Sequence, residues 1–415
     1  MDLKFALIDD DGIKKMEGEA EATLRKNKVH FKTKKGETLE FKYKNMEGIE
    51  EKDHNLDIDF FNKTSLSLSN LGYKFKGFSE RLRAKRNKKI LKLLLMEEGF
   101  KDRFEGEFGY IGVDRELKGD GEFRIYETGL VVIHSSGELF RIPYGDITEV
   151  NEEEYTIEIK TGIGEKLDLK KLGRAHKKFI DEFREAFSQL SENIQSELRE
   201  LSKLSDIDAY ELSEISKLMR DGRAVSEREI KDLSSNLWRA LMNSLDDVGL
   251  EWEYNFLTSL SEVDETSIGV KRGLMGDLTK QYVWLLVPIL NTDKEKLGNA
   301  VVMESSSNGT GKATYIFRAM EKSVYAETDS LSELKKTAQE FIKKMNRAMM
   351  DINFRREPIY LNDDKLEKKR YRKYKFAVQR MPSLRFLRQN YLGRVFHRSK
   401  DQWKQEVEDI LVEAC

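Results

Sequence analysis

The first half of the chain alternates apolar and polar residues in short runs that break at glycines. The segments 24–43 (LRKNKVHFKTKKGETLEFKY) and 123–144 (FRIYETGLVVIHSSGELFRIPY) alternate, turn at Lys-Gly-Glu or Ser-Gly-Glu, and alternate again. Successive side chains of a strand point to opposite faces of a sheet, so this pattern predicts antiparallel strands joined by tight turns. Further alternating runs, which predict more strands, follow at 55–61, 65–69, 155–160 and 166–172.

The pattern occurs twice, because the chain can be laid over itself with an offset of 101 residues and no gap. The register holds from Gly18 to Arg83, which is too long for scattered coincidence. A repeat of this length indicates a duplicated domain, since the repeats of solenoid proteins are shorter. The matched pairs include Gly18 and Gly119, Gly36 and Gly137, Tyr43 and Tyr144, Leu66 and Leu167, Leu71 and Leu172, and Phe78 and Phe179.

Each copy ends in a segment whose apolar residues recur at helical spacing. These residues are Phe78, Leu82, Ile90, Leu93 and Leu94 in the first copy, and Phe179, Ile180, Phe183 and Phe187 in the second. We therefore expect each copy to be an antiparallel sheet of about seven short strands, capped by one amphipathic helix at its C-terminal end.

Over residues 12–190 this layout resembles the pleckstrin-homology-like (PH-like) superfold, which includes the GRAM domains. The resemblance rests on the strand spacing and the terminal helix, because the superfold has no invariant sequence motif. It implies two tandem PH-like antiparallel barrels or sandwiches, in 1–103 and 104–190. Members of the superfold are typically non-enzymatic binders of phosphoinositides, peptides or partner proteins. Tandem copies resemble those of the histone chaperone FACT and of CheF, the archaeal adaptors between chemotaxis signalling and the motor.

Helices are expected next. Apolar residues at helical spacing over 175–204 predict a long helix that leaves the second copy, as a connector or as the arm of a homodimer. Two further helices are expected in 208–222 and 226–249, and Ser226 opens the second of them in a capping box. The region 191–250 is therefore a helical connector, either a plain helical hairpin or a winged-helix unit.

The region 251–360 mixes strand and helix patterns, which predicts a small α+β domain. Strands are expected at 281–290, 299–305 and 312–320, and a helix at 330–352. The first of these strands is apolar on both faces and should lie at the centre of a sheet. The fold class of the whole chain is therefore α+β.

Charge is balanced overall, with 73 Lys and Arg against 75 Asp and Glu, but it is unevenly distributed. From Lys365 to Lys404 there are fourteen Lys or Arg and two acids, and aromatic residues alternate with them. Cations neutralise phosphates, and aromatic rings stack on bases or lie among lipid headgroups. The region 361–415 is thus expected to be a basic, aromatic-rich helical segment that contacts an acidic partner, an anionic membrane or nucleic acid, or docks on the acidic remainder of the chain.

Two groups of cations are candidate anion-binding residues. Lipid-binding PH-like domains use basic residues between their first two strands, and the resemblance places the KTKKGE hairpin of the first copy there. The alternative is an ordinary solvated hairpin. The candidates are Lys32, Lys34 and Lys35 in the hairpin, and Lys368, Lys369, Arg370, Arg372, Lys373 and Lys375 in the C-terminal segment.

The residues that usually carry catalytic or metal-binding chemistry form no recognisable pattern in this sequence. The five histidines are scattered, and the one cysteine is Cys415. The acidic run 9–12 (DDDG) lacks the later ligands of a calcium loop and is interpreted as a turn. We therefore expect no catalytic residues, no metal site and no cofactor, and a chain that is not an enzyme.

The stretch 304–314 (ESSSNGTGKAT) resembles a phosphate-binding loop. That loop requires Gly-x4-Gly-Lys followed by Ser or Thr, whereas Ser306 takes the place of the first glycine and Ala313 that of the hydroxyl. Strand patterns flank the stretch on both sides, so we expect a hairpin turn. A nucleotide-dependent enzyme that uses Lys312 is the weaker alternative.

No run of 18 apolar residues occurs, and the N-terminus does not look like a signal peptide. A cytoplasmic protein is expected. The function that these patterns favour is a non-enzymatic signalling adaptor that binds partner proteins through its tandem PH-like domains. A peripheral membrane protein or a nucleic-acid-binding protein is the alternative.

Overall fold

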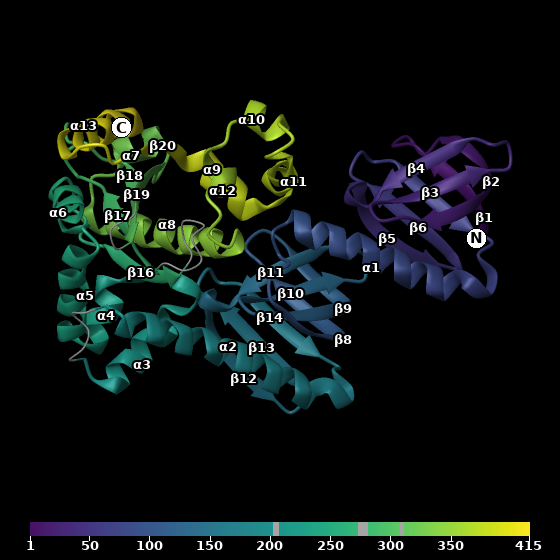
Figure 1. Ribbon diagram of the computed structural model, residues 1–415, viewed down its shortest axis with the longest axis horizontal. Helices are drawn as coiled ribbons and strands as arrows, with labels where there is room; N and C mark the ends of the chain where they lie inside the picture. The colour runs from purple at the N-terminus through teal and green to yellow at the C-terminus, as the bar shows by residue number, and fades with distance from the viewer. Residues whose placement is uncertain (202–206, 273–280, 308–310) are drawn as a thin grey trace.

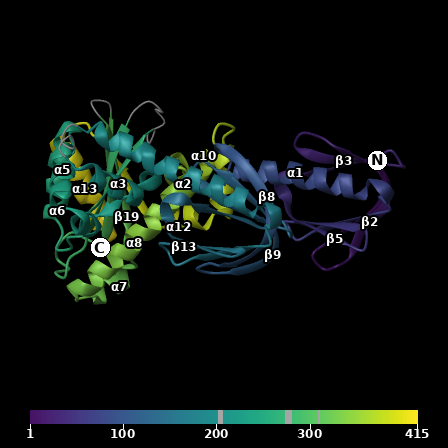
Figure 2. The same ribbon diagram turned by 90° about the horizontal axis from the view of Figure 1, so that it is seen from below.

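Three antiparallel sheets, each covered by helices, form the α+β fold of the chain in a computed structural model (Figure 1). The structure describes residues 1–201, 207–272, 281–307 and 311–415. Figures 1 and 2 show the first sheet at one end of the molecule, the third at the other end and the second between them. No described helix is long and apolar enough to span a bilayer.

The first unit is a seven-stranded sheet with the order β4-β3-β2-β1-β7-β6-β5, followed by one long helix. Its strands alternate buried and exposed residues, as the sequence pattern predicts, and the buried side chains form a core of their own. The elements are β1 (Asp2–Ile8), β2 (Lys14–Leu24), β3 (Lys28–Thr33), β4 (Thr38–Lys42), β5 (Met46–Lys52), β6 (Asn55–Phe60), β7 (Ser65–Ser69) and α1 (Phe75–Leu93).

The second unit repeats this topology with the order β11-β10-β9-β8-β14-β13-β12. From β10 to the start of α2, each element begins 101 residues after its counterpart, which is the offset found in the sequence. β8 begins at Phe100, inside the range 1–103 that was assigned to the first domain. The elements are β8 (Phe100–Ile111), β9 (Glu116–Tyr126), β10 (Gly129–His134), β11 (Leu139–Pro143), β12 (Ile147–Glu153), β13 (Thr156–Thr161), β14 (Lys166–Lys170) and α2 (His176–Arg199).

The third unit is a six-stranded sheet with helices on both faces, in the order β15-β16-β17-β18-β19-β20. β17 lies inside the sheet as expected, and its side chains alternate between two cores: Trp284 enters one and Leu285 the other. The strands are β15 (Val225–Ser226), β16 (Ser267–Arg272), β17 (Gln281–Ile289), β18 (Ala300–Ser307), β19 (Gly311–Arg318) and β20 (Tyr391–Val395). The helices are α3 (Ala209–Leu218), α4 (Glu227–Leu233), α5 (Ser235–Asp247), α6 (Glu251–Ser259), α7 (Lys322–Glu327), α8 (Leu331–Asp351), α9 (Glu357–Tyr360), α10 (Asp363–Glu367), α11 (Arg372–Arg380), α12 (Pro382–Asn390) and α13 (Lys400–Ala414).

This unit corrects the expected division of the C-terminal half. The expected connector, α+β domain and tail form one folded unit. One core contains Leu241 from the expected connector, Val283 from the expected domain and Trp403 from the expected tail. β20 pairs with β19, so the C-terminal segment completes the sheet and docks within the chain. The capping box at Ser226 is present, but the helix that it opens ends at Leu233, and Ser234 caps a separate helix, α5.

α2 connects the second and third units. Its first half buries Phe179 and Phe183 in the core of the second unit, and its second half buries Ile194 and Leu198 in the third. The apolar stripe that suggested a dimerisation arm is therefore buried within the chain. Residues 202–204 of the expected helix lie outside the described residues, and a homodimer through this helix stays a prediction.

Candidate anion-binding site

The lysines predicted in the first hairpin do not lie between the first two strands. Lys32 lies in β3, and Lys34 and Lys35 form the turn from β3 to β4, where all three are exposed. The first strand of the unit is β1, which precedes the alternating runs recognised in the sequence. The assignment of KTKKGE to the loop between the first two strands was therefore wrong.

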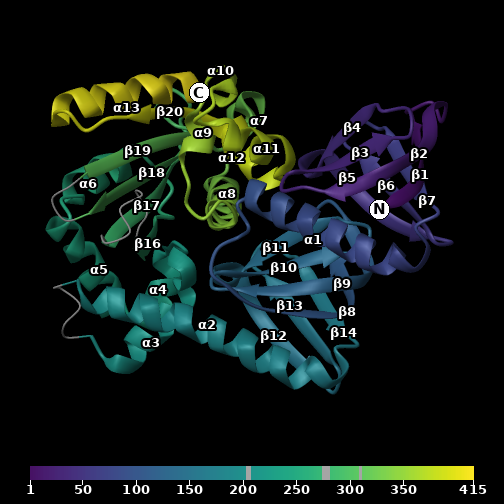
Figure 3. The ribbon, with the colours of Figure 1, turned by 45° about the vertical axis from the view of Figure 1, so that its right-hand side comes forward.

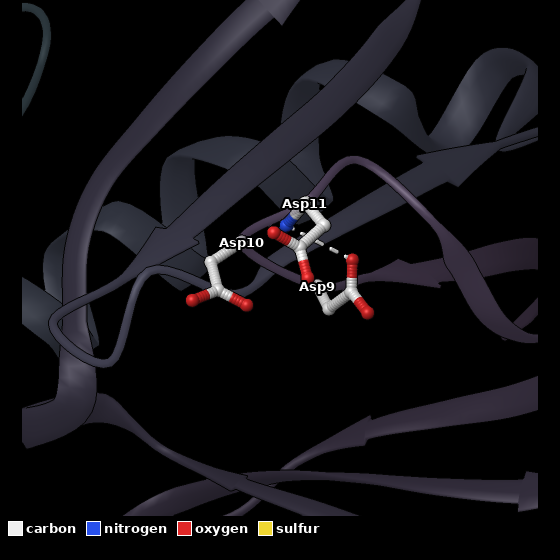
Figure 4. A group of neighbouring side chains, drawn as sticks. All are labelled: Asp9, Asp10 and Asp11. Carbon is white, nitrogen blue, oxygen red and sulfur yellow. Dashed lines mark hydrogen bonds between the residues drawn. The ribbon is translucent and has the colours of Figure 1, made fainter.

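The loop between β1 and β2 is acidic. One carboxylate oxygen from each of Asp9, Asp10 and Asp11 lies within 4.8 Å of the other two, and Figure 4 shows the three side chains. Asp9 Oδ1 accepts the backbone N–H of Asp11 at 3.1 Å and that of Ile13 at 2.8 Å, and Lys15 lies 3.4 Å from the other oxygen. These are the contacts of a hydrogen-bonded turn. The loop between β1 and β2 therefore lacks the cations that a phosphate ligand needs.

The cations predicted in the C-terminal segment are mostly on the surface. Lys368, Lys369, Arg370 and Lys373 are exposed, whereas Lys375 is half-buried and pairs with Glu367. The side chain of Arg372 lies outside the described part of the chain. The aromatic residues among them turn inward: Tyr374 is buried in the core, and Tyr371, Phe376 and Phe386 pack against it.

A pocket of about 880 Å³ lies where the first unit meets the C-terminal segment. Figures 1 and 3 show α11 beside the first unit, and α11 contacts α1. Among the described residues that line the pocket, seven are Lys or Arg and one is acidic. The lining consists of Asn27, Lys28, Lys42, Lys44, Lys89, Lys92, Leu93, Leu95, Glu97, Arg355, Lys373 and Tyr374.

Local structure brings the cations of the first unit together. Lys42 ends β4, and Lys44 lies in the short 3-10 helix η1 (Tyr43–Asn45) that follows. Tyr43 fixes this helix, because its ring is buried and its hydroxyl donates to the Arg25 carbonyl at 2.9 Å. Lys89 and Lys92 lie one helical turn apart on α1, so both reach the same side of the helix.

The pocket carries an excess of positive charge. Lys28 Nζ lies 2.5 Å from Glu40, and Arg355 pairs with Glu98. Among the described residues, Lys42, Lys89, Lys92 and Lys373 make no ion pair within 4.0 Å. Several cations without acidic partners create a positive potential that attracts anions, and low-dielectric walls strengthen it.

Direct contacts between the two walls set the shape of the pocket. The rings of Phe61 and Phe376 lie 5.9 Å apart, and the guanidinium of Arg380 lies 3.6 Å from the centre of the Phe61 ring. Asn353 Nδ2 donates to the Leu95 carbonyl at 2.7 Å. These contacts keep Lys373 and Arg355 close to the cations of the first unit.

Of the predicted cations, the structure places Lys373 in the pocket. The others that line it were missed, because each is an ordinary surface lysine in its own stretch of sequence. The run RNKKILK at the end of α1 is the one local signal, since it is rich in lysine on the exposed side of a helix. The partners on the opposite wall follow more than 250 residues later, at Arg355 and Lys373.

The stretch that resembles a phosphate-binding loop lies in a hairpin. β18 pairs with β19 in antiparallel register, with Ser307 opposite Gly311, as the flanking strand patterns predict. Residues 308–310 lie outside the described residues. The ammonium of Lys312 binds Glu253 at 2.6 Å, so an acidic side chain already holds the group that would meet a phosphate.

Comparison with known proteins does not assign the chain. No protein-family model matches it, and no curated protein matches it. The C-terminal domain of an unknown protein from Leishmania infantum is 16% identical, with 24% of this chain and 96% of that domain covered and a TM-score of 0.20. A structure of Vav1 inhibited by an allosteric inhibitor is 14% identical, with 28% of this chain and 37% of the Vav1 chain covered and a TM-score of 0.20. TM-scores this low support no conclusion about the fold or the function of this chain.

Proposed function

We propose that this chain is a non-enzymatic, cytoplasmic adaptor that binds an anionic ligand where its first unit meets its C-terminal segment. We assign its two seven-stranded units to the PH-like superfold, because they share one strand order and each ends in a helix. The observation that carries the ligand assignment is the pocket, in which seven of the described lining residues are Lys or Arg and one is acidic.

The anion-binding assignment is tested by replacing cations inside and outside the pocket. The pocket variant is Lys42→Gln, Lys89→Gln and Lys92→Gln, and the control is Lys32→Gln, Lys34→Gln and Lys35→Gln on the same unit. Fluorescence anisotropy with labelled polyanions should show weaker binding of the pocket variant, and binding of the control close to that of the unchanged chain. Equal weakening of both variants would indicate general surface charge and would contradict a dedicated site.

Partner proteins are assigned to the open edge of the second sheet. β12 is an edge strand that exposes Glu149, Glu152 and Glu153, and Tyr155 beside it is 74% exposed. An extended peptide can add to such an edge through main-chain hydrogen bonds, and the acidic side chains favour a basic peptide. Affinity purification should recover a partner that is lost when Glu149 and Glu153 are both changed to Lys. A partner retained by this variant binds elsewhere.

An anionic membrane or a nucleic acid, bound mainly through Lys365–Lys404, is the second candidate. Exposed Lys368, Lys369 and Arg370 favour it, because they lie outside the pocket and are free to meet a large surface. Binding through many phosphates falls steeply with salt. Changing these three residues to Gln should then reduce binding to liposomes or single-stranded DNA more than the pocket variant does.

A further inference from the structure

We propose that a compact anion carrying several phosphate groups bridges the two walls of the basic pocket and so holds the first unit against the C-terminal segment. This inference rests on the proposed function, because it specifies the ligand of the same pocket and the effect of its binding. One wall consists of the turn after β2, η1 and the end of α1. The other consists of Arg355 and α11.

In the second unit, the face that corresponds to η1 packs against the third unit. The residues equivalent to Lys44 and Asn45 are Gly145 and Asp146, in the 3-10 helix η3 (Tyr144–Asp146). A Cβ atom at Gly145 would lie 2.4 Å from the backbone oxygen of Arg220, so the third unit approaches closely there. Asp146 accepts a hydrogen bond from Arg347 of α8 at 2.9 Å, and both side chains are buried. Opposite charges therefore fix this joint without a ligand.

In the first unit, the equivalent face meets a wall of the same charge. Lys42 of the first unit and Lys373 of α11 both line the pocket, and neither makes an ion pair with a described residue. Like charges repel, and the contacts around Phe61, the Asn353–Leu95 hydrogen bond and the packing of Ile90 and Leu94 oppose this repulsion. An anion between the walls would supply the opposite charge that Asp146 supplies in the second unit.

The first unit also has an attachment that does not depend on the pocket. Arg86 of α1 is buried and donates to the carbonyl of Met46 at 3.2 Å and to that of Gly137 in the second unit at 2.6 Å. Arg83 donates to the carbonyl of Ser135 at 2.6 Å. The first unit is thus held at the β10–β11 hairpin whether or not the pocket is occupied, and the ligand would strengthen its attachment to the C-terminal segment.

The pocket suits a small ligand with clustered phosphates. Its volume of about 880 Å³ falls within the range of small-molecule sites. Its cations are mainly lysines, which bind phosphate as compact point charges. Stacking of nucleic-acid bases requires exposed aromatic faces, whereas Tyr374, the one aromatic residue among the described lining, is buried and donates its hydroxyl to Glu357 at 2.8 Å.

The experiment measures binding of inorganic tripolyphosphate to the full chain by calorimetry, and hydrogen exchange with and without it. We expect slower exchange in α11 and in residues 27–28, where the turn after β2 leads into β3, at the same time. A second variant, Lys42→Gln, Lys89→Gln and Lys373→Gln, changes cations of both walls and should bind roughly tenfold more weakly or worse. The control Lys32→Gln, Lys35→Gln, Lys368→Gln removes the same charge at exposed sites and should keep both the affinity and the protection.

The outcomes separate this inference from the proposed function. Binding with protection of one wall alone would overturn the bridge and leave anion binding intact. Binding to single-stranded oligonucleotide but not to tripolyphosphate would overturn the compact ligand. Parallel arms with vesicles that contain phosphatidylinositol bisphosphate and with orthophosphate identify the source: bridging by vesicles alone assigns the phosphates to a lipid headgroup. Failure of every anion to bind would overturn the proposed function as well.

Discussion

His397 shows how a residue without local partners becomes part of a buried polar cluster. Its Nε2 lies 3.0 Å from Glu304 and 2.9 Å from the hydroxyl of Thr314, and its Nδ1 lies 3.5 Å from Glu253. Burial alone would lower the pKa of His397, but the hydrogen bonds to the two glutamates outweigh it and raise the pKa to about 9. The imidazole is therefore protonated at neutral pH and fixes β20 to β18.

This cluster predicts a loss of stability at alkaline pH. The pKa of His397 is about 9 in the folded chain and about 6.5 in the unfolded chain, so its contribution is full below about pH 6.5 and disappears as the pH rises through about 9. Urea denaturation should show the free energy of unfolding falling by about 2 kcal/mol over this range, after allowance for solvent screening. His397→Gln should abolish that slope. An equal slope in the variant would assign the effect to other groups.

No local pattern in the sequence indicated this cluster, because the acidic partners of His397 lie far from it along the chain. Glu304 lies 93 positions before it in the chain. Pattern analysis compares neighbours along a strand or helix, and here the partners meet through the pairing of β20 with β19, beside β18. A histidine that gains its partners from sheet topology cannot be recognised from spacing.

At the scale of elements, the buried Arg347 of α8 and the buried Arg141 of β11 join α8 to the second unit. Arg347 donates to Asp146 at 2.9 Å, to the carbonyl of Arg141 at 2.8 Å and to Asp351 at 3.2 Å, and it also binds Glu165. Burial raises the pKa of Asp146 to about 6 in spite of the opposing effect of Arg347. The positive charge of the Arg347 guanidinium therefore compensates the negative charge of these buried carboxylates, where α8 meets the second unit.

Removing that charge should be costly. In Arg347→Met, Asp146 and Glu165 stay buried but lose the cation that they bind, and breaking a buried pair in this way costs about 3–5 kcal/mol. Lys343→Met changes an exposed residue of the same helix and serves as the control. Urea denaturation should show a large loss for the first variant and little change for the second. Similar losses would mean that the joint depends on packing and not on charge.

Gly145 gives a second test of the same joint. In Gly145→Ala, the new Cβ would lie 2.4 Å from the Arg220 oxygen and 2.5 Å from Met350 Sδ, so η3 must move away from the third unit. Overpacking of this kind costs about 1–3 kcal/mol. The equivalent residue of the first unit is Lys44, and Lys44→Ala should cost less. Thermal unfolding compares the two, and equal shifts would contradict the close approach at Gly145.

The elements that the sequence predicts well are those whose signal is local. Strands β3, β4, β10 and β11 follow the alternating runs, and the capping box at Ser226 marks the start of α4. The break at Ser234 was missed, because apolar spacing continues across it and the serine that caps α5 could equally lie on the surface of one long helix. Local patterns thus locate elements better than they locate the breaks between them.

For the whole molecule, the cores predict which parts can fold alone. The fully buried residues of the first core all lie between Leu3 and Leu82, within the first unit. The helix of the second unit, by contrast, also places Ile194 and Leu198 in the third unit. The main core of the first unit is therefore contained within that unit, whereas the helix of the second unit shares its core residues with the third.

Two fragments check this difference. The fragment 1–98 should unfold cooperatively in urea, although the end of α1 should fray because Ile90 and Leu94 pack on the third unit in the full chain. The fragment 99–201 should be far less stable, since Ile194 and Leu198 lose the core that covers them. Circular dichroism measures both. Cooperative unfolding of the two fragments at similar urea concentrations would contradict the shared core.

The pocket forms where distant parts of the chain pack together. The sequence therefore indicated a basic C-terminal segment, but of the cations that it singled out, Lys373 lines the pocket. The excess of cations after Lys365 was visible in composition. Their position opposite Lys89 and Lys92 depends on the docking of α11 beside α1, which no pattern within either segment records. Composition predicts the chemistry of a ligand, and tertiary structure decides where that ligand can bind.

The repeated 3-10 helices, η1 and η3, also bear on the history of the chain. A domain that is copied starts with two identical contact faces, but a single neighbour can occupy only one of them. In the copy that kept the neighbour, Gly145 and Asp146 are constrained by what they touch. In the other copy, the counterpart of Gly145 is Lys44, which lines the pocket instead. Duplication thereby offers a route by which a structural joint becomes a place for a new ligand.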